Sequence, residues 1–143
     1  MVADARPDGE LAAFEQVPLS HLVNVWGIVK PWLEAALKNN PRYSMKDVWG
    51  LVESGNWQMW VAVTDRIEAV CLTTLIEYPQ QKWAHVIALT GRNRRAWQQQ
   101  YHDTIEAWAK ANGCAGVESE ARKGWARIFP DYRMTHLKLE KEF

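Results

Sequence analysis

The chain has 143 residues, of which 48% are hydrophobic and 24% charged, and its formal net charge is zero. This balance predicts one soluble globular domain that folds without disulfides or metals. The lack of a basic excess argues against a dedicated nucleic-acid binder, and the lack of an apolar run of about 18 residues argues against a membrane protein.

The N-terminal region is expected to hold a strand and a helical segment. Residues 1–12 are polar, with Pro7 and Gly9, so we expect a flexible arm ahead of a single domain over residues 13–143. A first strand is expected around residues 14–19, and Ser20 is expected to cap the helix that follows. Pro31 either kinks that helix or opens a second one.

The middle of the chain predicts a capped helix and then a meander. Ser44 and Asp47 have the spacing of a capping box, and Gly55 fits the left-handed position past the helix end. Residues 57–64, 67–78 and 83–89 are rich in β-formers and are separated by short turns. They predict three antiparallel strands.

The last third predicts one long helix and alternating short elements. A helix of about 18 residues is expected after Asn93, because apolar residues recur four apart, and Gly113 ends it. A strand over residues 114–117, a short helix over 122–129 and a closing strand over 134–139 follow. The order of elements is that of an α+β domain.

Cysteines and tryptophans suggest a core rather than a metal site. Cys71 and Cys114 lie in apolar runs without metal-ligand spacing, so we interpret them as buried thiols of a reducing compartment, and expect a cytoplasmic protein. Nine tryptophans indicate either an aromatic core or exposed anchors of a protein interface. The histidines show no metal spacing, and no metal is expected.

The order of elements resembles that of the GNAT (Gcn5-related N-acetyltransferase) superfamily over almost the whole chain, and short GNAT-like proteins of phages most of all. The resemblance implies a mixed, mostly antiparallel sheet with helices on both faces. It rests on Asp47-Val-Trp, Glu53-Ser-Gly55, Trp60-Val-Ala, Tyr78-Pro79, Trp97, Glu106-Ala-Trp-Ala109, Gly113-Cys114 and Arg122…Gly124-Trp125…Arg127.

The resemblance implies a CoA site between the fourth strand and the long helix. Small residues in that loop let backbone N–H groups approach the pyrophosphate. Here Arg95 and Trp97 stand where two small residues are expected, and Gly91 remains permissive. The cofactor-binding candidates are therefore Gly91, Arg92, Asn93, Arg94 and Arg95, and the alternative is a solvated basic loop.

The resemblance also implies a tyrosine that protonates the leaving thiolate. Phe129 falls at its position and has no proton to give, whereas Tyr132 lies one turn further on. A general base needs a carboxylate or imidazole near the amine. Four residues on or beside the strands could serve as this base: Glu77, His85, Glu118 and Glu120. Of these, Glu118 is the catalytic candidate.

Two functions follow. The first is a GNAT-like protein that has lost catalysis, needs no cofactor and acts through protein–protein contacts, with phage structural proteins or copies of itself, as a virion-associated or assembly component. The second is an acyl-CoA-dependent N-acyltransferase with an altered pyrophosphate loop, which would use acetyl-CoA or another acyl-CoA. Contact of the basic residues with nucleic-acid phosphates is a weaker third idea.

Overall fold

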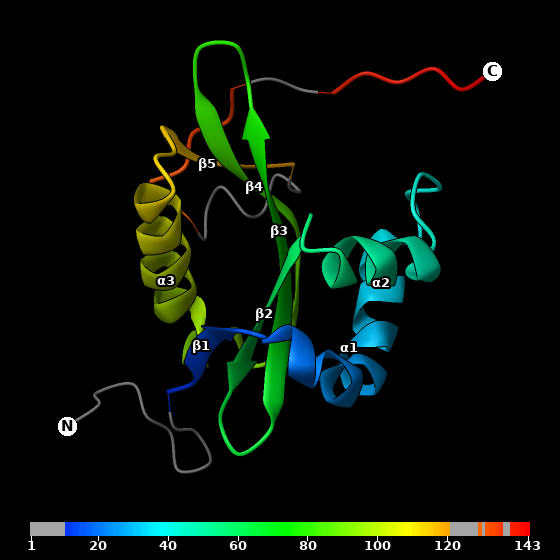
Figure 1. The fold of residues 1–143 in the computed structure, drawn as a ribbon, viewed down its shortest axis with the longest axis vertical. Coiled ribbons are helices and arrows are strands. Elements are labelled where there is room, and N and C mark those ends of the chain that lie inside the picture. The colour runs from blue at the N-terminus through cyan, green and yellow to red at the C-terminus, as the bar shows by residue number, and fades with distance from the viewer. Residues whose placement is uncertain (1–10, 121–128, 130, 136–137) are drawn as a thin grey trace.

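A computed structural model describes residues 11–120, 129, 131–135 and 138–143. Its centre is a five-stranded sheet in the order β1-β2-β3-β4-β5 (Figure 1). The strands are β1 (Ala13–Gln16), β2 (Gln58–Val63), β3 (Ile67–Glu77), β4 (Lys82–Gly91) and β5 (Gly116–Ser119). Neighbours are antiparallel except β4 and β5, which are parallel. The predicted meander is therefore confirmed.

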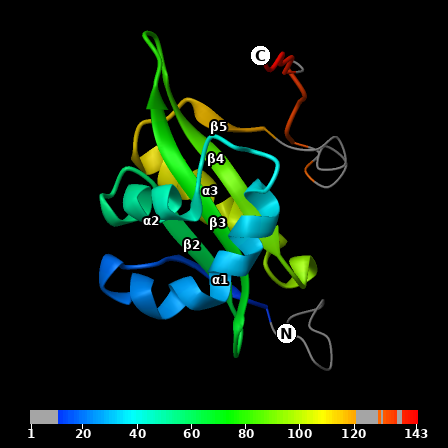
Figure 2. The ribbon, with the colours of Figure 1, turned by 90° about the vertical axis from the view of Figure 1, so that its right-hand side faces the viewer.

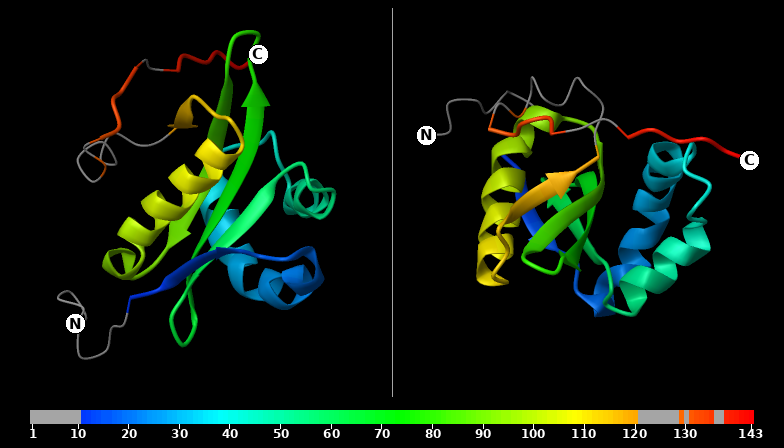
Figure 3. Two further views of the ribbon diagram at one scale, coloured as in Figure 1. Left: turned by 60° about the vertical axis from the view of Figure 1, so that its left-hand side comes forward. Right: turned by 90° about the horizontal axis from the view of Figure 1, so that it is seen from above.

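Helices cover both faces of this sheet. The helices α1 (Leu22–Leu37) and α2 (Met45–Glu53) lie on one face, and α3 (Gln98–Ala111) lies on the other (Figures 1 and 3). Figure 2 shows α1 and α2 in front of the strands. Two short 3₁₀ helices, η1 (Leu19–His21) and η2 (Arg94–Ala96), lead into α1 and α3. None of the helices in the described residues is long and apolar enough to cross a membrane.

Each face has its own hydrophobic core. On the α1 face, Leu33 and Val29 pack with Met59, Val70 and Leu72 of the sheet. On the α3 face, Ile105 and Tyr101 pack with other residues, among them Phe14, Trp60, Cys71 and Trp97. Alternate residues of β2 and β3 therefore serve opposite cores, as the period of a strand requires.

The helix starts show one correct and one wrong prediction. Ser44 and Asp47 form the capping box, with Oγ of Ser44 accepting from the Asp47 amide at 3.1 Å and Oδ2 of Asp47 accepting from the Ser44 amide at 2.9 Å. Ser20 does not cap α1, because it lies inside η1, and His21 is the residue before the helix. Pro31 does not open a second helix, since α1 runs through it to Leu37.

The end of the chain departs from the prediction. The closing strand expected over residues 134–139 is wrong for Met134, Thr135, Lys138 and Leu139, which lie outside any strand and are exposed. Side chains this exposed have no buried face to fix a register. Glu140 is held instead by Arg42 at 2.9 Å and Lys138 at 3.1 Å. The short helix expected over residues 122–129 lies outside the described residues, apart from Phe129.

The aromatic core is the better interpretation of the tryptophans. Trp57, Trp60 and Trp97 are buried. The other five tryptophans that the structure describes are half-buried: Trp26, Trp32, Trp49, Trp83 and Trp108. Several pack edge-to-face against other rings, as Trp60 does against Trp108 with centroids 5.3 Å apart. Cys71 is buried, and burial raises the pKa of its thiol, whereas Cys114 is only half-buried.

Candidate functional site

The loop after β4 begins at a glycine that the sheet itself requires. Gly91 is the last residue of β4 and pairs with Ala69 of β3. A Cβ atom here would overlap the carbonyl oxygen of Glu68 and the backbone of Ala69, and φ is +156°. The permissive residue of the predicted CoA loop is thus used for a close approach of two protein backbones.

A buried carboxylate from β3 holds the next two residues. Glu68 is only 2% exposed. Its Oε1 accepts from Nε of Arg66 at 3.0 Å and from Nε of Arg92 at 3.2 Å, and its Oε2 accepts from Nδ2 of Asn93 at 2.9 Å. Burial raises the pKa of the Glu68 carboxyl, but these hydrogen bonds and the nearby guanidinium groups lower it further than burial raises it.

The five predicted loop residues therefore divide into two groups. Arg92 faces the protein, with its guanidinium 5.6 Å from the Trp32 ring centroid and its backbone amide donating to the Glu68 carbonyl at 2.8 Å. Asn93 takes the left-handed conformation, with φ of 59°. Arg94 and Arg95 are exposed, and neither side chain has a hydrogen-bond or ion-pair partner among the described residues. Among the described loop residues, these two therefore have the side chains most available to an external anion.

The side chain of Trp97 lies in the core and not at the surface of the loop. Its side chain is 2% exposed and packs in the core of the α3 face. Its indole Nε1–H donates to the carbonyl of Arg92 at 2.8 Å, which ties the loop to the core. The expectation that Trp97 crowds a pyrophosphate is therefore corrected, because the side chain points to the core rather than to the loop surface.

The strand β5 pairs with only the first part of β4. They pair from Trp83 with Gly116 to Val86 with Ser119. The strand β4 then continues to Gly91, and its register to β3 shifts after Val86, as in a β-bulge. We call the end of this pairing, at Val86 and Ser119, the fork.

Three polar side chains meet one residue pair before the fork. His85 and Glu118 are register partners on β4 and β5. The hydroxyl of Tyr78 donates to Oε1 of Glu118 at 2.7 Å, and this bond raises the pKa of Tyr78. Nδ1 of His85 is 3.8 Å from the same oxygen; it is buried and has no hydrogen-bond partner. The side chains of His85 and Glu118 are 22% and 33% exposed, so solvent reaches the group.

The other carboxylates considered from the sequence lie elsewhere in ion pairs. Glu77 lies 3.7 Å from Nζ of Lys82 at the β3–β4 turn, and Glu120 lies 3.5 Å from Nζ of Lys138. Tyr78 is not among the site residues that the sequence predicts, because its partner Glu118 is 40 residues away along the chain. Only the parallel pairing of β5 brings the two together.

Tyr132 lies on the opposite face of the sheet. It packs against the core that contains Val86, and its ring centroid is 5.9 Å from that of Phe129 and 5.7 Å from that of His102. Burial is the main cause that raises the pKa of Tyr132, to about 12. The hydroxyl thus keeps its proton at neutral pH. Phe129 is buried against Tyr101 and His102, so it serves packing.

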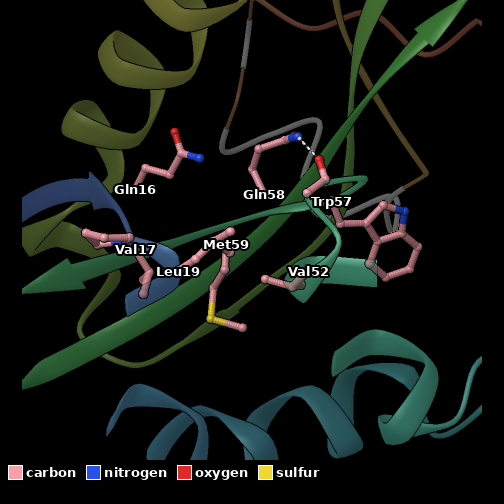
Figure 4. Close-up of a pocket in the computed structure, with 9 residues that line it drawn as sticks. Gln16, Val17, Leu19, Val52, Trp57, Gln58 and Met59 are labelled. Atoms are coloured by element: carbon pink, nitrogen blue, oxygen red, sulfur yellow. Dashed lines mark hydrogen bonds between the residues drawn. The ribbon is translucent and has the colours of Figure 1, made fainter. Parts of the chain in front are cut away.

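A separate pocket lies at the other edge of the sheet. Its volume is about 380 Å³, and it is lined by residues around the end of β1 and the start of β2, including Gln16, Leu19, Trp57 and Gln58 (Figure 4). None of the residues that line it is charged. It is far in strand order from the fork, since β1 and β5 are opposite edges. Among the described residues, no group of three His, Cys, Asp or Glu side chains could hold a metal ion.

No protein-family model and no curated protein matches the chain, but solved structures do. A predicted acetyltransferase from Clostridium acetobutylicum, solved with acetyl-CoA, matches with a TM-score of 0.68 and 13% identity over 92% of this chain and 96% of that one. Glucosamine-6-phosphate N-acetyltransferase from Arabidopsis thaliana matches with a TM-score of 0.65 and 12% identity over 94% and 99%.

A third match is an aminoglycoside acetyltransferase from an uncultured soil metagenomic sample, solved with sisomicin. Its TM-score is 0.63 and its identity 15%, over 92% of this chain and 97% of that one. The chain has the GNAT fold. This similarity confirms the predicted fold class. At these identities it establishes the architecture only, so any activity must be argued from the residues at the fork and in the loop.

Proposed function

We propose that this protein is an acyl-CoA-dependent N-acyltransferase whose reaction centre is the fork between β4 and β5. The observation that carries the proposal is the group of Tyr78, His85 and Glu118 beside the end of the pairing between the two strands. The acetyl-CoA bound by the similar protein of Clostridium acetobutylicum supports the choice of cofactor.

The roles follow from the positions of the side chains. Glu118, with His85 beside it, is placed to accept the proton that the amine loses as its nitrogen attacks the acyl carbon. An acyl-CoA supplies the activated acyl group as a thioester. Tyr132, protonated and on the α3 side of the fork, is the group proposed to donate a proton to the sulfur that leaves. Glu118 thus gains the proton that the amine loses, and Tyr132 loses the proton that the leaving sulfur gains, so the protons balance over the reaction.

The loop is proposed to bind the phosphates of CoA through Arg94 and Arg95. Both side chains are exposed, and a guanidinium is suited to phosphate because its donors match the oxygens in pairs. Gly91 and Trp97 hold the loop against the sheet and the core. The available donors are thus arginine side chains rather than a glycine-rich backbone.

The deciding experiment is isothermal titration with acetyl-CoA. We expect micromolar binding that Arg94→Gln/Arg95→Gln weakens by at least about tenfold, with a smaller effect at high salt, because exposed charges are screened. The matched control is Arg133→Gln, another exposed arginine outside the loop. No heat at millimolar acetyl-CoA would reject the proposal.

A second candidate is a GNAT-like protein without catalysis that works through protein contacts, in a phage particle or its assembly. Two observations favour it: Glu68 occupies the donors of Arg92 and Asn93, and Leu19, Val23 and Ile28 are exposed on η1 and α1. The phage setting rests on the sequence resemblance alone. This candidate expects no acetyl-CoA binding, and a self-association or particle association that Val23→Lys abolishes.

A further inference from the structure

Glu68 is a charged side chain that the proposed reaction does not use, yet it is the most enclosed carboxylate among the described residues. Its side chain is 2% exposed, and both of its oxygens accept hydrogen bonds from the loop or its neighbours. A buried charge of this kind is retained only when its partners compensate the loss of hydration.

We propose that Glu68 is a positioning residue for the anion-binding loop: it holds Arg92 and Asn93 against β3, so that Arg94 and Arg95 present the binding surface. This inference rests on the proposed function of that loop. Glu68 does not touch the cofactor, and it acts only through the residues it holds.

The geometry gives Glu68 control of the loop at three points. The Arg92 amide donates to the Glu68 carbonyl, the Arg92 guanidinium to Oε1, and the Asn93 amide group to Oε2. Asn93 is in the left-handed conformation, which asparagine adopts more readily than most residues with a side chain, and its bond to Oε2 helps to hold it there. Two of these three bonds are made by the carboxylate, which therefore braces the turn into η2.

The carboxylate also decides which arginines remain free. Arg66 and Arg92 both contact Oε1, so the single negative charge of Glu68 is shared between these two guanidinium groups. Arg94 and Arg95 lie outside this group. An external phosphate would then meet Arg94 and Arg95 as the loop arginines whose guanidinium groups no described carboxylate contacts, in a position that the turn held by Glu68 sets.

The opposite hypothesis is that Glu68 competes with phosphate for Arg92. Removing the charge would then release Arg92 and tighten binding. The two hypotheses predict changes of opposite sign from the same substitution, which makes Glu68→Gln decisive. Glutamine keeps the shape of the side chain and one acceptor but loses the charge.

The experiment records the indole N–H resonances of the full chain by NMR, together with titration of acetyl-CoA. The Trp97 indole reports the loop, because it donates to the Arg92 carbonyl, and the buried Trp60 indole, which donates to Thr73 at 2.9 Å, reports the intact sheet. The control variant is Glu15→Gln, an exposed carboxylate of β1 with the same change in charge.

With Glu68→Gln we expect a shifted or broadened Trp97 indole resonance, an unchanged Trp60 resonance, and acetyl-CoA binding weaker by at least about tenfold. Glu68→Asp, which keeps the charge, should recover part of the affinity. An unchanged Trp97 resonance would overturn the inference, and so would tighter binding. If the native chain binds no acetyl-CoA, the proposed function fails, but the Trp97 resonance still tests whether Glu68 positions the loop.

Discussion

Two carboxylates on the same sheet, Glu68 and Glu118, have opposite surroundings. Glu68 is almost fully buried at the loop end of β3 and is compensated by two guanidinium groups and an amide. Glu118 is one-third exposed near the fork, with one hydroxyl donor and a histidine at 3.8 Å. The first side chain is committed to structure, and the second is open to a bound molecule.

The comparison teaches how to separate function from stability in this fold. A buried ion pair costs hydration, and the protein retains Glu68 where it fixes a turn. A partly solvated carboxylate beside a histidine keeps the access and the proton acceptor that catalysis requires. Substitutions at the fork should therefore affect the reaction rate, whereas substitutions at the loop end of β3 and β4 should affect stability.

The largest expected effect is on the rate at the fork. If Glu118 accepts the proton of the amine, Glu118→Gln should lower kcat by about 10²- to 10⁴-fold and leave the KM for acetyl-CoA nearly unchanged. The measurement is steady-state release of free CoA with an amine that the native chain acylates. Glu77→Gln, at the end of β3, is the control and should retain the native kcat. Equal rates for the two variants would remove Glu118 from the mechanism.

The next effect is on stability at the loop end. Gly91→Ala should lower the free energy of unfolding by about 1–3 kcal/mol, because the new Cβ meets the backbone of Glu68 and Ala69. Gly50→Ala in α2 has open space around its new Cβ and should raise the free energy of unfolding by up to about 1 kcal/mol. Urea denaturation gives both values. A neutral Gly91→Ala would contradict the close approach of β3 and β4.

The smallest effect concerns His102 on the α3 face. Burial lowers the pKa of this histidine from 6.5, against the opposing effects of Glu106, Asp103 and Asp131. The unfolded chain therefore binds a proton at a higher pH than the folded one, and the free energy of unfolding should decrease as the pH falls through about 6.5. His102→Gln should flatten this slope in thermal melts between about pH 5 and 7, whereas the exposed His21→Gln should retain it.

Much of the fold could be predicted from the sequence because its signals are local. Strand residues with a period of two, the Ser44–Asp47 capping box and the left-handed Gly55 each depend on neighbours within a few residues. The prediction that Ser20 caps the first helix was wrong, because a side chain suited to capping does not determine which turn becomes a 3₁₀ helix. The prediction of the closing strand failed at Met134, Thr135, Lys138 and Leu139 because these residues are exposed and have no buried face.

The candidate site, too, could be predicted from the sequence only in part. The sequence by itself determined the α+β order, the basic loop after β4, and Glu118 and Tyr132 as candidate groups. Only the tertiary structure decided that Glu68 binds Arg92, that Trp97 faces the core, and that Tyr78 and His85 meet Glu118. These contacts join residues up to 40 positions apart through sheet pairing and burial, and neither can be inferred from spacing along the chain.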